Sequence, residues 1–282
     1  MIYEYFMTAD NVRLAYKDEG SGLPLLALAG LTRDGRDFDY LSHHLPRCRL
    51  IRLDSRGRGG SQWANVVTYT VAHEAADAIA LLDHLDIPQA AVIGTSRGGL
   101  LGLLMAATAR QRLLGLCLND VGPVVEFHGL ERIAEYVGIH PAVATIEEVM
   151  DRLPARSPGF VDVPDFRWAE EAVRHFVETP DGLNNPYDPA IGEALRAALT
   201  KPLADAWPLF DACAGLPLAL IRAENSDILS QATATEMRRR RPDMLFAEVA
   251  KRGHAPFLDE PAAISLIHEW LTELEDYRPP AE

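Results

Sequence analysis

The first half of the chain alternates short apolar runs with longer amphipathic stretches. Four runs have the length of buried strands, and two stretches between them repeat apolar positions at helical spacing. Strands that are covered on both faces read as continuous apolar runs, so the pattern predicts a twisted, mainly parallel sheet with helices on both faces. The predicted strands are residues 25–29, 50–53, 90–93 and 114–118, and the predicted helices are residues 71–85 and 100–109.

The pattern changes between residues 124 and 207. Strand-like runs disappear there, prolines interrupt the segment, and short amphipathic helices dominate. Strand character returns at residues 216–221 and 245–249, and a last helix is predicted over 261–274. This order predicts an α/β core formed by residues 1–123 and 208–282, with residues 124–207 inserted as a helical cap.

Composition and charge narrow the range of partners. With 48% hydrophobic and 24% charged residues, the 282-residue chain resembles a globular protein that buries a large core. The 41 acidic and 27 basic residues give a net charge of -14, which repels phosphate backbones and anionic lipid surfaces. The basic run at residues 238–241 follows Glu236 near the end of a predicted helix, where cations are favourable. We therefore expect a small-molecule ligand and neither nucleic acid nor a membrane, and the sequence leaves a homodimer open.

The cysteines and the N-terminus bear on the compartment. Cys48, Cys117 and Cys213 are widely spaced and form no metal or redox motif, which indicates reduced thiols. Charged residues interrupt the first twenty positions, unlike the apolar segment of a signal peptide, and no apolar run reaches the about 18 residues that a membrane span needs. These features predict a cytoplasmic protein.

A candidate nucleophile lies in the motif Gly94-Thr95-Ser96-Arg97-Gly98. The pattern Gly-x-Ser-x-Gly is weak alone, but here a strand-like run precedes it and a predicted helix follows it. That setting is the sharp turn in which a strained serine exposes its hydroxyl, and small residues two positions to either side let the strand and the helix approach closely. The alternative is a tight turn in which Ser96 only caps the helix.

Serine needs a histidine base, and the histidine needs a carboxylate that holds its tautomer. His254 is the best-placed of nine histidines, because it lies in the loop between the last predicted strand and the last helix. For the acid we favour Asp227, in the loop after residues 216–221. Asp120, just beyond the strand that ends at Leu118, and Glu224 stay open. No spacing of histidines suggests a metal site, and we expect no cofactor.

With these residues in view, the sequence resembles the α/β-hydrolase superfamily, in which the order along the chain is serine, acid, histidine. Further matches are Ala29–Thr32 at the position of the oxyanion loop, the DSRGRGGS segment at residues 54–61, and Gly253-His254-Ala255-Pro256 near the end. The resemblance covers nearly all of the chain except the cap. It is strongest to cap-bearing bacterial esterases and enol-lactonases.

The resemblance implies that the backbone N–H groups of Leu31 and Arg97 form the oxyanion hole. Ala29 stands where the family commonly has histidine, so support for this loop must come from elsewhere. Arg97 is unusual beside a nucleophile; we expect its charge to face a carboxylate on a covering helix, and the alternative is that it lowers the pKa of nearby groups.

The sequence thus predicts a serine hydrolase that cleaves a small ester or lactone. The same triad in other members suggests hydrolysis of a carbon–carbon bond or cofactor-free perhydrolysis, and a ligand-binding member without turnover is the third alternative. For the substrate pocket the candidates are Trp168 and Trp207 from the cap, for which the alternative is the core of the cap itself. Arg33, two residues beyond Leu31, is a further candidate that suits a substrate carboxylate, and the alternative for it is a solvated side chain.

Overall fold

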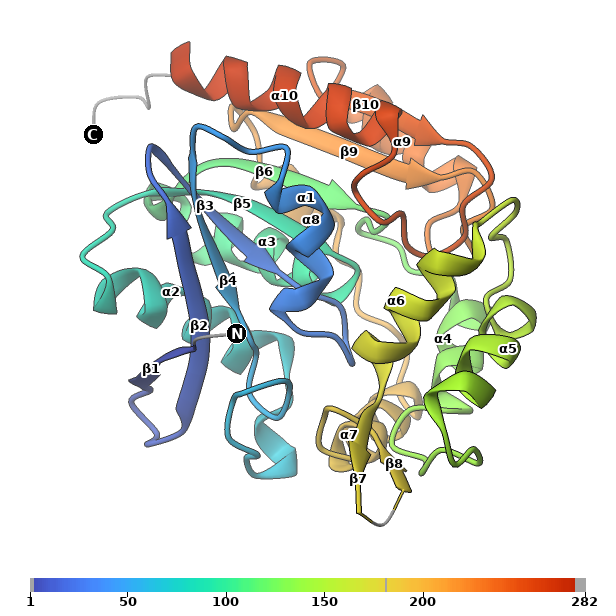
Figure 1. Ribbon diagram of the computed structural model, residues 1–282. Coiled ribbons are helices and arrows are strands. Elements are labelled where there is room, and N and C mark those ends of the chain that lie inside the picture. The colour runs from blue at the N-terminus through green and yellow to red at the C-terminus, as the bar shows by residue number, and fades with distance from the viewer. Residues whose placement is uncertain (1–2, 181, 277–282) are drawn as a thin grey trace.

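The computed structural model describes residues 3–180 and 182–276. Its centre is an eight-stranded sheet with helices on both faces (Figure 1). The strands are β1 (Glu4–Met7), β2 (Arg13–Gly20), β3 (Leu23–Leu28), β4 (Cys48–Leu53), β5 (Ala90–Thr95), β6 (Leu113–Asn119), β9 (Leu218–Ala223) and β10 (Leu245–Val249).

The helices of the core are α1 (Asp39–Ser42), α2 (Val71–His84), α3 (Arg97–Thr108), α8 (Trp207–Asp211), α9 (Gln231–Arg240) and α10 (Pro261–Asp276). Residues 124–207 contain α4 (Phe127–Ala134), α5 (Ile146–Arg156), α6 (Asp165–His175), β7 (Val177–Thr179), β8 (Gly182–Asn184) and α7 (Ala190–Leu199). Short 3-10 turns lie at Gly35–Phe38, Val66–Thr68 and Arg110–Arg112.

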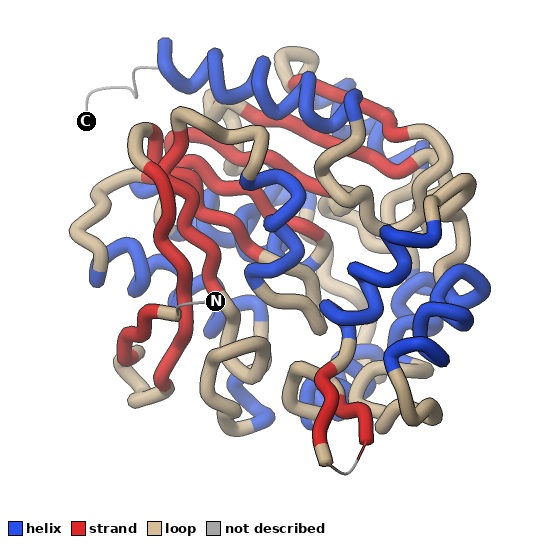
Figure 2. Tube along the Cα trace, in the orientation of Figure 1, coloured by secondary structure: helices blue, strands red, loops and turns tan. Residues whose placement is uncertain are grey.

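The strand order is β1-β2-β4-β3-β5-β6-β9-β10. The six strands from β4 to β10 run parallel, as the sequence predicts, whereas β1 and β2 pair antiparallel at one edge. The sequences of these two strands, EYFM and RLAYKDEG, hold apolar stretches of only three residues, which is too short to predict a buried strand. Figure 2 shows the strands as one continuous twisted layer between helices.

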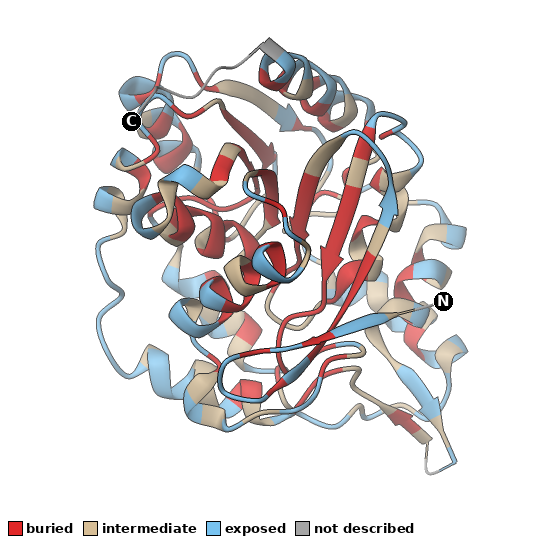
Figure 3. Ribbon diagram, turned by 90° about the vertical axis from the view of Figure 1, so that its left-hand side faces the viewer, coloured by how far each residue is buried: buried red, intermediate tan, exposed pale blue. Residues whose placement is uncertain are grey.

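The sheet separates two apolar cores because successive side chains of a strand point to opposite faces. In β3, Leu26 and Leu28 pack with α2, α3, α8 and α9, whereas Leu25 and Ala27 pack with α1 and α10. Figure 3 shows the central strands buried along their length, with the exposed surface on the outer helices and on β1. The sheet thus holds the carboxyl ends of β5 and β6 rigidly, and the functional side chains described below follow them.

The segment assigned to the cap gathers at one side of the sheet (Figure 1). It differs from the expected all-helical insertion, because β7 and β8 form a small antiparallel hairpin. Among residues 3–180 and 182–276, no helix combines the length and the apolar content required to cross a bilayer.

Candidate active site

Ser96 occupies the sharp turn between β5 and α3, with φ 52° and ψ -116°. Residues other than glycine rarely adopt a positive φ, so the packing around Ser96 must impose this backbone conformation. Strand and helix approach so closely that a Cβ on Gly94 would lie 2.4 Å from the Gly98 carbonyl carbon, and a Cβ on Gly98 would lie 1.9 Å from the Leu28 carbonyl oxygen. The two glycines of the motif are therefore required by sterics.

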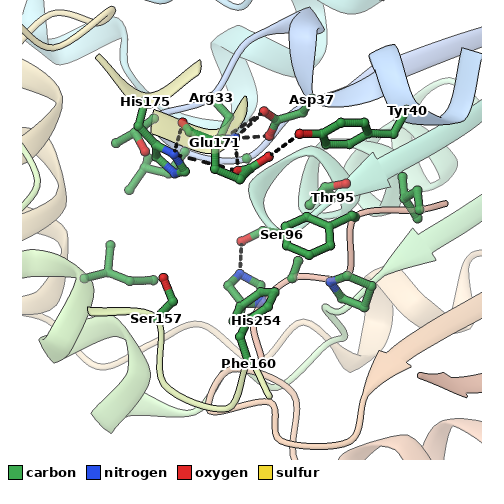
Figure 4. Close-up of a pocket in the computed structure, with 18 of the residues that line it drawn as sticks. Arg33, Asp37, Tyr40, Thr95, Ser96, Ser157, Phe160, Glu171, His175 and His254 are labelled. Carbon is green, nitrogen blue, oxygen red and sulfur yellow. Dashed lines mark hydrogen bonds and ion pairs between the residues drawn. The ribbon is translucent and has the colours of Figure 1, made fainter. Parts of the chain in front are cut away.

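The Ser96 hydroxyl does not cap α3. Its Oγ lies 2.8 Å from Nε2 of His254, which comes from the loop between β10 and α10 (Figure 4). The alternative that Ser96 is only an N-cap therefore does not hold. The structure brings together two side chains that are 158 residues apart in the sequence.

The carboxylate on the other side of His254 is Asp120. Its Oδ2 lies 2.8 Å from His254 Nδ1 and also accepts a 2.8 Å hydrogen bond from the Ser226 hydroxyl. Oδ1 accepts a hydrogen bond of 2.9 Å from the Ala223 backbone N–H. Asp120 is fully buried at the end of β6, so three donors hold its carboxylate in one orientation.

Asp227, the acid that the sequence favours, is engaged elsewhere. Its Oδ2 accepts a 2.6 Å hydrogen bond from Nε of Arg132 on α4, and the pair fastens the β9–α9 loop to the cap segment. Glu224 accepts a hydrogen bond from the Lys251 backbone N–H. The structure thus corrects the first choice of acid in favour of the alternative Asp120. Asp120 follows its strand by one residue, whereas Asp227 is four residues beyond the end of β9 at Ala223.

A buried ionic network joins the two segments that are expected to form the oxyanion hole. Arg58 donates from Nε to the Leu31 carbonyl oxygen at 2.8 Å and from Nη1 to Glu74 on α2 at 3.0 Å. Arg97 donates to the same carboxylate from Nε at 2.7 Å and from Nη2 at 2.8 Å.

Both Arg58 and Glu74 have side chains that are 1% exposed, and the two guanidinium groups hold the pKa of Glu74 below its usual value despite burial. The expected carboxylate partner of Arg97 is thus Glu74. Arg58 supplies the support for the Leu31 loop that the missing histidine at Ala29 leaves open. Arg58 belongs to the DSRGRGGS segment, but no local pattern in the sequence indicates that Glu74 is its partner.

A cavity of about 190 Å³ opens at Ser96 and His254. Figure 4 shows Arg33, Asp37, Tyr40, Glu171 and His175 gathered on one side of Ser96, with His254 and Phe160 on the other. We call these five residues the polar wall. In the described residues, no cluster of three or more His, Cys, Asp or Glu side chains is arranged to hold a metal ion.

Arg33 lies in the pocket, as the sequence predicts, but its charge is already paired. Its Nε donates to both oxygens of Asp37, at 2.9 and 2.8 Å, and its Nη2 donates to Glu171 on α6 at 3.0 Å. Burial raises the pKa of Asp37, and both carboxylates hold the pKa of Arg33 above its usual value in spite of burial. This pairing contradicts the expectation that Arg33 is available to a substrate carboxylate.

Of the two tryptophans predicted for the pocket, only Trp168 lies in it. Trp168 on α6 lines it and packs edge-on against Phe160, with ring centroids 6.0 Å apart. Trp207 does not line it. Trp207 is the first residue of α8, where its ring packs against Phe210 and under the Arg240 guanidinium. Helix α8 packs against α3 in the core, so Trp207 belongs to the core and not to the cap. Tyr40, Glu171 and His175 were missed, since nothing in the sequence showed which face of each helix would meet the pocket.

Three comparisons place the chain among known proteins. Residues 25–265 match the model of the Alpha/beta hydrolase family. The chain is 33% identical over 275 residues to a 3-hydroxybutyrate-oligomer hydrolase from Cupriavidus necator, covering 92% of this chain and 93% of the relative. A crystal structure of an alpha/beta hydrolase from Novosphingobium aromaticivorans superposes with a TM-score of 0.89 at 38% identity, covering 96% of this chain and 98% of that one.

Proposed function

This chain belongs to the alpha/beta hydrolase family, and from that premise we propose that it is a serine hydrolase that cleaves a small carboxylic ester or lactone through an acyl-enzyme at Ser96. The observation that carries the proposal is the chain of hydrogen bonds from Asp120 through His254 to Ser96, each 2.8 Å long. An acceptor on Nδ1 keeps the proton on that nitrogen and leaves the lone pair of Nε2 facing the serine hydroxyl.

The first half of the reaction forms the ester bond to Ser96. His254 Nε2 takes the hydroxyl proton as Oγ attacks the substrate carbonyl carbon, and the buried Asp120 carboxylate stabilises the imidazolium that forms. The backbone N–H groups of Leu31 and Arg97 donate to the oxyanion. Collapse of the tetrahedral intermediate breaks the bond to the leaving alkoxide, which receives the proton from His254 and departs as the alcohol.

The second half restores the enzyme. Water enters the site, gives a proton to His254 and attacks the acyl carbon, and the second tetrahedral intermediate then releases the carboxylic acid as Ser96 recovers its proton. The net reaction converts the ester and one water to an alcohol and a carboxylic acid. His254 carries each proton between the reacting groups, so the reaction needs no cofactor.

The network on Glu74 supports the assignment of the oxyanion hole. Electrostatic stabilisation of an oxyanion requires donors that are held in place before the reaction. Arg58 fixes the carbonyl of Leu31, and Arg97 is tied by its own side chain, so one carboxylate braces both segments. The guanidinium of Arg97 binds Glu74 and so stays away from the pocket. The role that we propose for Arg97 in the oxyanion hole belongs to its backbone N–H.

The relatives support an ester as substrate. The oligomer hydrolase from Cupriavidus necator is named for an oligomer of a hydroxy acid, in which ester bonds join the units. Residues 124–207 would serve as the cap over the site. Helix α6 of this segment contributes Trp168 and Glu171 to the pocket, whereas Ser96 comes from the turn that follows β5 of the core.

Steady-state hydrolysis of 4-nitrophenyl butyrate by wild type and Ser96→Ala tests the proposal. We expect turnover to fall by at least about 10³-fold in the variant, because the nucleophile is lost while the oxyanion donors and binding remain. Circular dichroism and thermal unfolding of both proteins would establish equal folding. Turnover of the variant near that of wild type would overturn the role of Ser96.

A further inference from the structure

The polar wall begins next to the nucleophile. A Cβ placed on Gly30 would lie 3.8 Å from Ser96 Cβ and 3.4 Å from Arg33 Cγ, so both side chains border the same position of the backbone. The wall therefore lies within reach of a substituent a few bonds from an ester carbonyl held at Ser96. Its chemistry decides which substituent fits.

Most hydrogen-bond donors of the polar wall are already paired within the protein. Arg33 Nε and Nη2 donate to Asp37 and Glu171, and the Tyr40 hydroxyl donates to Glu171 Oε1 at 3.0 Å. Arg33 Nη1 has no hydrogen-bond partner among the described residues, but less than 1 Å² of this atom is exposed, so it does not face the open part of the pocket. A substrate acceptor such as a carboxylate finds no N–H or O–H of these groups available.

Acceptors remain on the same wall. A carboxylate offers about four lone-pair directions, and each oxygen of Glu171 accepts only one hydrogen bond from Tyr40 or Arg33. Within the wall one guanidinium faces two carboxylates, Asp37 and Glu171. Two more guanidinium groups contact Tyr40, but Arg174 is paired with Asp39 and Arg167 with Asp259, so in the part of the chain that the structure describes this side of the pocket has no unpaired positive charge to attract an anion.

His175 adds a third acceptor. Its Nδ1 lies 2.7 Å from the Glu171 backbone carbonyl oxygen, and an N–H on Nδ1 is the group that can bond there. The tautomer with that proton leaves a lone pair on Nε2. Burial, reinforced by Arg33, lowers the pKa of His175 to about 3, which agrees with a neutral ring. The side chain is 34% exposed and lines the pocket.

We propose that the polar wall accepts a hydrogen bond from a hydroxyl group of the substrate, so that the protein prefers uncharged esters with a hydroxyl on the acyl chain and discriminates against acyl chains that end in a carboxylate. This inference rests on the proposed ester hydrolysis and specifies its substrate class. It replaces the expectation that Arg33 recognises a carboxylate. A 3-hydroxyacyl group, as in the name of the Cupriavidus necator relative, has the required donor.

Three ethyl esters with four-carbon acyl chains test the preference: ethyl butyrate, ethyl 3-hydroxybutyrate and monoethyl succinate. Hydrolysis is followed by proton release at constant pH. We expect kcat/KM of wild type to be about tenfold higher for the hydroxy ester than for butyrate, the size of one hydrogen bond to a fixed acceptor, and about tenfold lower for the succinate. Equal values for the three esters, or a preference for the succinate, would overturn the inference.

Substitutions at His175 and Glu171 test whether the polar wall causes the preference for the hydroxy ester. His175→Met removes the acceptor at similar size, whereas His175→Gln keeps an oxygen near the position of Nε2. We expect the ratio of hydroxybutyrate to butyrate to fall several-fold in the first variant and to persist in the second. Glu171→Gln should raise the rate with succinate relative to butyrate, because it removes a negative charge. Ratios unchanged in all three variants would contradict the assignment.

Failure of the two proposals is distinguishable. A wild-type protein that hydrolyses none of the esters, nor 4-nitrophenyl butyrate, would contradict the proposed function. A protein that hydrolyses all of them without preference keeps that function and loses this inference. Since the substrate ratios of wild type are informative alone, a variant that does not fold leaves the test intact.

Discussion

Glu74 offers the sharpest test of how the fold supports the proposed oxyanion hole. Glu74→Gln keeps the shape of the side chain and removes its charge. The change leaves Arg58, whose side chain is 1% exposed, and the partly buried Arg97 without their shared counter-charge. Breaking a buried ion pair costs about 3–5 kcal/mol, and Gln keeps one acceptor oxygen, so we expect stability to fall by about 3 kcal/mol.

We also expect Glu74→Gln to lower kcat, because Arg58 and Arg97 position the two segments of the proposed oxyanion hole. Arg58 fixes the Leu31 carbonyl at 2.8 Å, and Arg97 follows the nucleophile directly. Loss of a whole oxyanion donor costs about 10²–10³ in kcat, and a displaced donor costs less. We therefore expect kcat for 4-nitrophenyl butyrate to fall by about ten- to a hundredfold with KM little changed, measured well below the melting temperature.

Asp77→Asn is the matched control. Asp77 lies one turn further along α2, has a side chain that is 5% exposed, and binds Arg56, in the same loop as Arg58, through two hydrogen bonds of 2.7 Å. Arg56 keeps Asp10 as a second partner at 2.9 Å, so we expect a smaller loss of stability, measured by urea unfolding, with kcat within about threefold of wild type. If Glu74→Gln lost stability but kept the kcat of the control, Glu74 would be only structural and the reasoning would be refuted.

Other predictions address the acid, the turn and the pocket. Asp120→Asn should lower kcat by about 10⁴-fold because the histidine tautomer is lost, whereas Asp227→Asn should keep kcat within a few-fold; the opposite order would restore Asp227 as the acid. Gly98→Ala should destabilise the protein by about 3 kcal/mol in urea unfolding, since its Cβ would lie 1.9 Å from a carbonyl oxygen, and an unchanged midpoint would refute that packing. His175 should make stability pH-dependent: its pKa is lowered from 6.5 to about 3, so below pH 6.5 only the unfolded chain takes up the proton and the folded state loses stability down to about pH 3. The urea midpoint of wild type should thus fall more between pH 7.5 and 5 than that of His175→Gln, although solvent at the third of the side chain that is exposed weakens the effect, and parallel curves would contradict it.

The sequence predicted the fold and the sharp turn that carries Ser96, because the signals for both are local. Apolar runs marked β3 to β6, β9 and β10, and the glycines around Ser96 report steric demands that neighbouring residues alone impose. His254 was found by its place between the last strand and the last helix. The edge strand β1 and its neighbour β2 were not predicted, because partly exposed strands lack a continuous apolar run.

The acid and the pocket could not be predicted, because they depend on contacts between distant segments. Asp120 and Asp227 both follow strands whose carboxyl ends lie side by side, as β6 pairs with β9. Arg132 on α4 decides between them by binding Asp227, and Ser226 reinforces Asp120. The pairing of Arg33 with Glu171 spans 138 residues and likewise has no local signal.

Covalent labelling tests the central claim most directly. Wild-type protein is treated with a fluorophosphonate, digested and mapped by mass spectrometry, with Asp120→Asn and Ser96→Ala alongside. The account predicts one modified residue, Ser96, with slow labelling of Asp120→Asn and none of Ser96→Ala. Absence of label on the wild type, or label on Ser157, the other serine of the pocket, would contradict it.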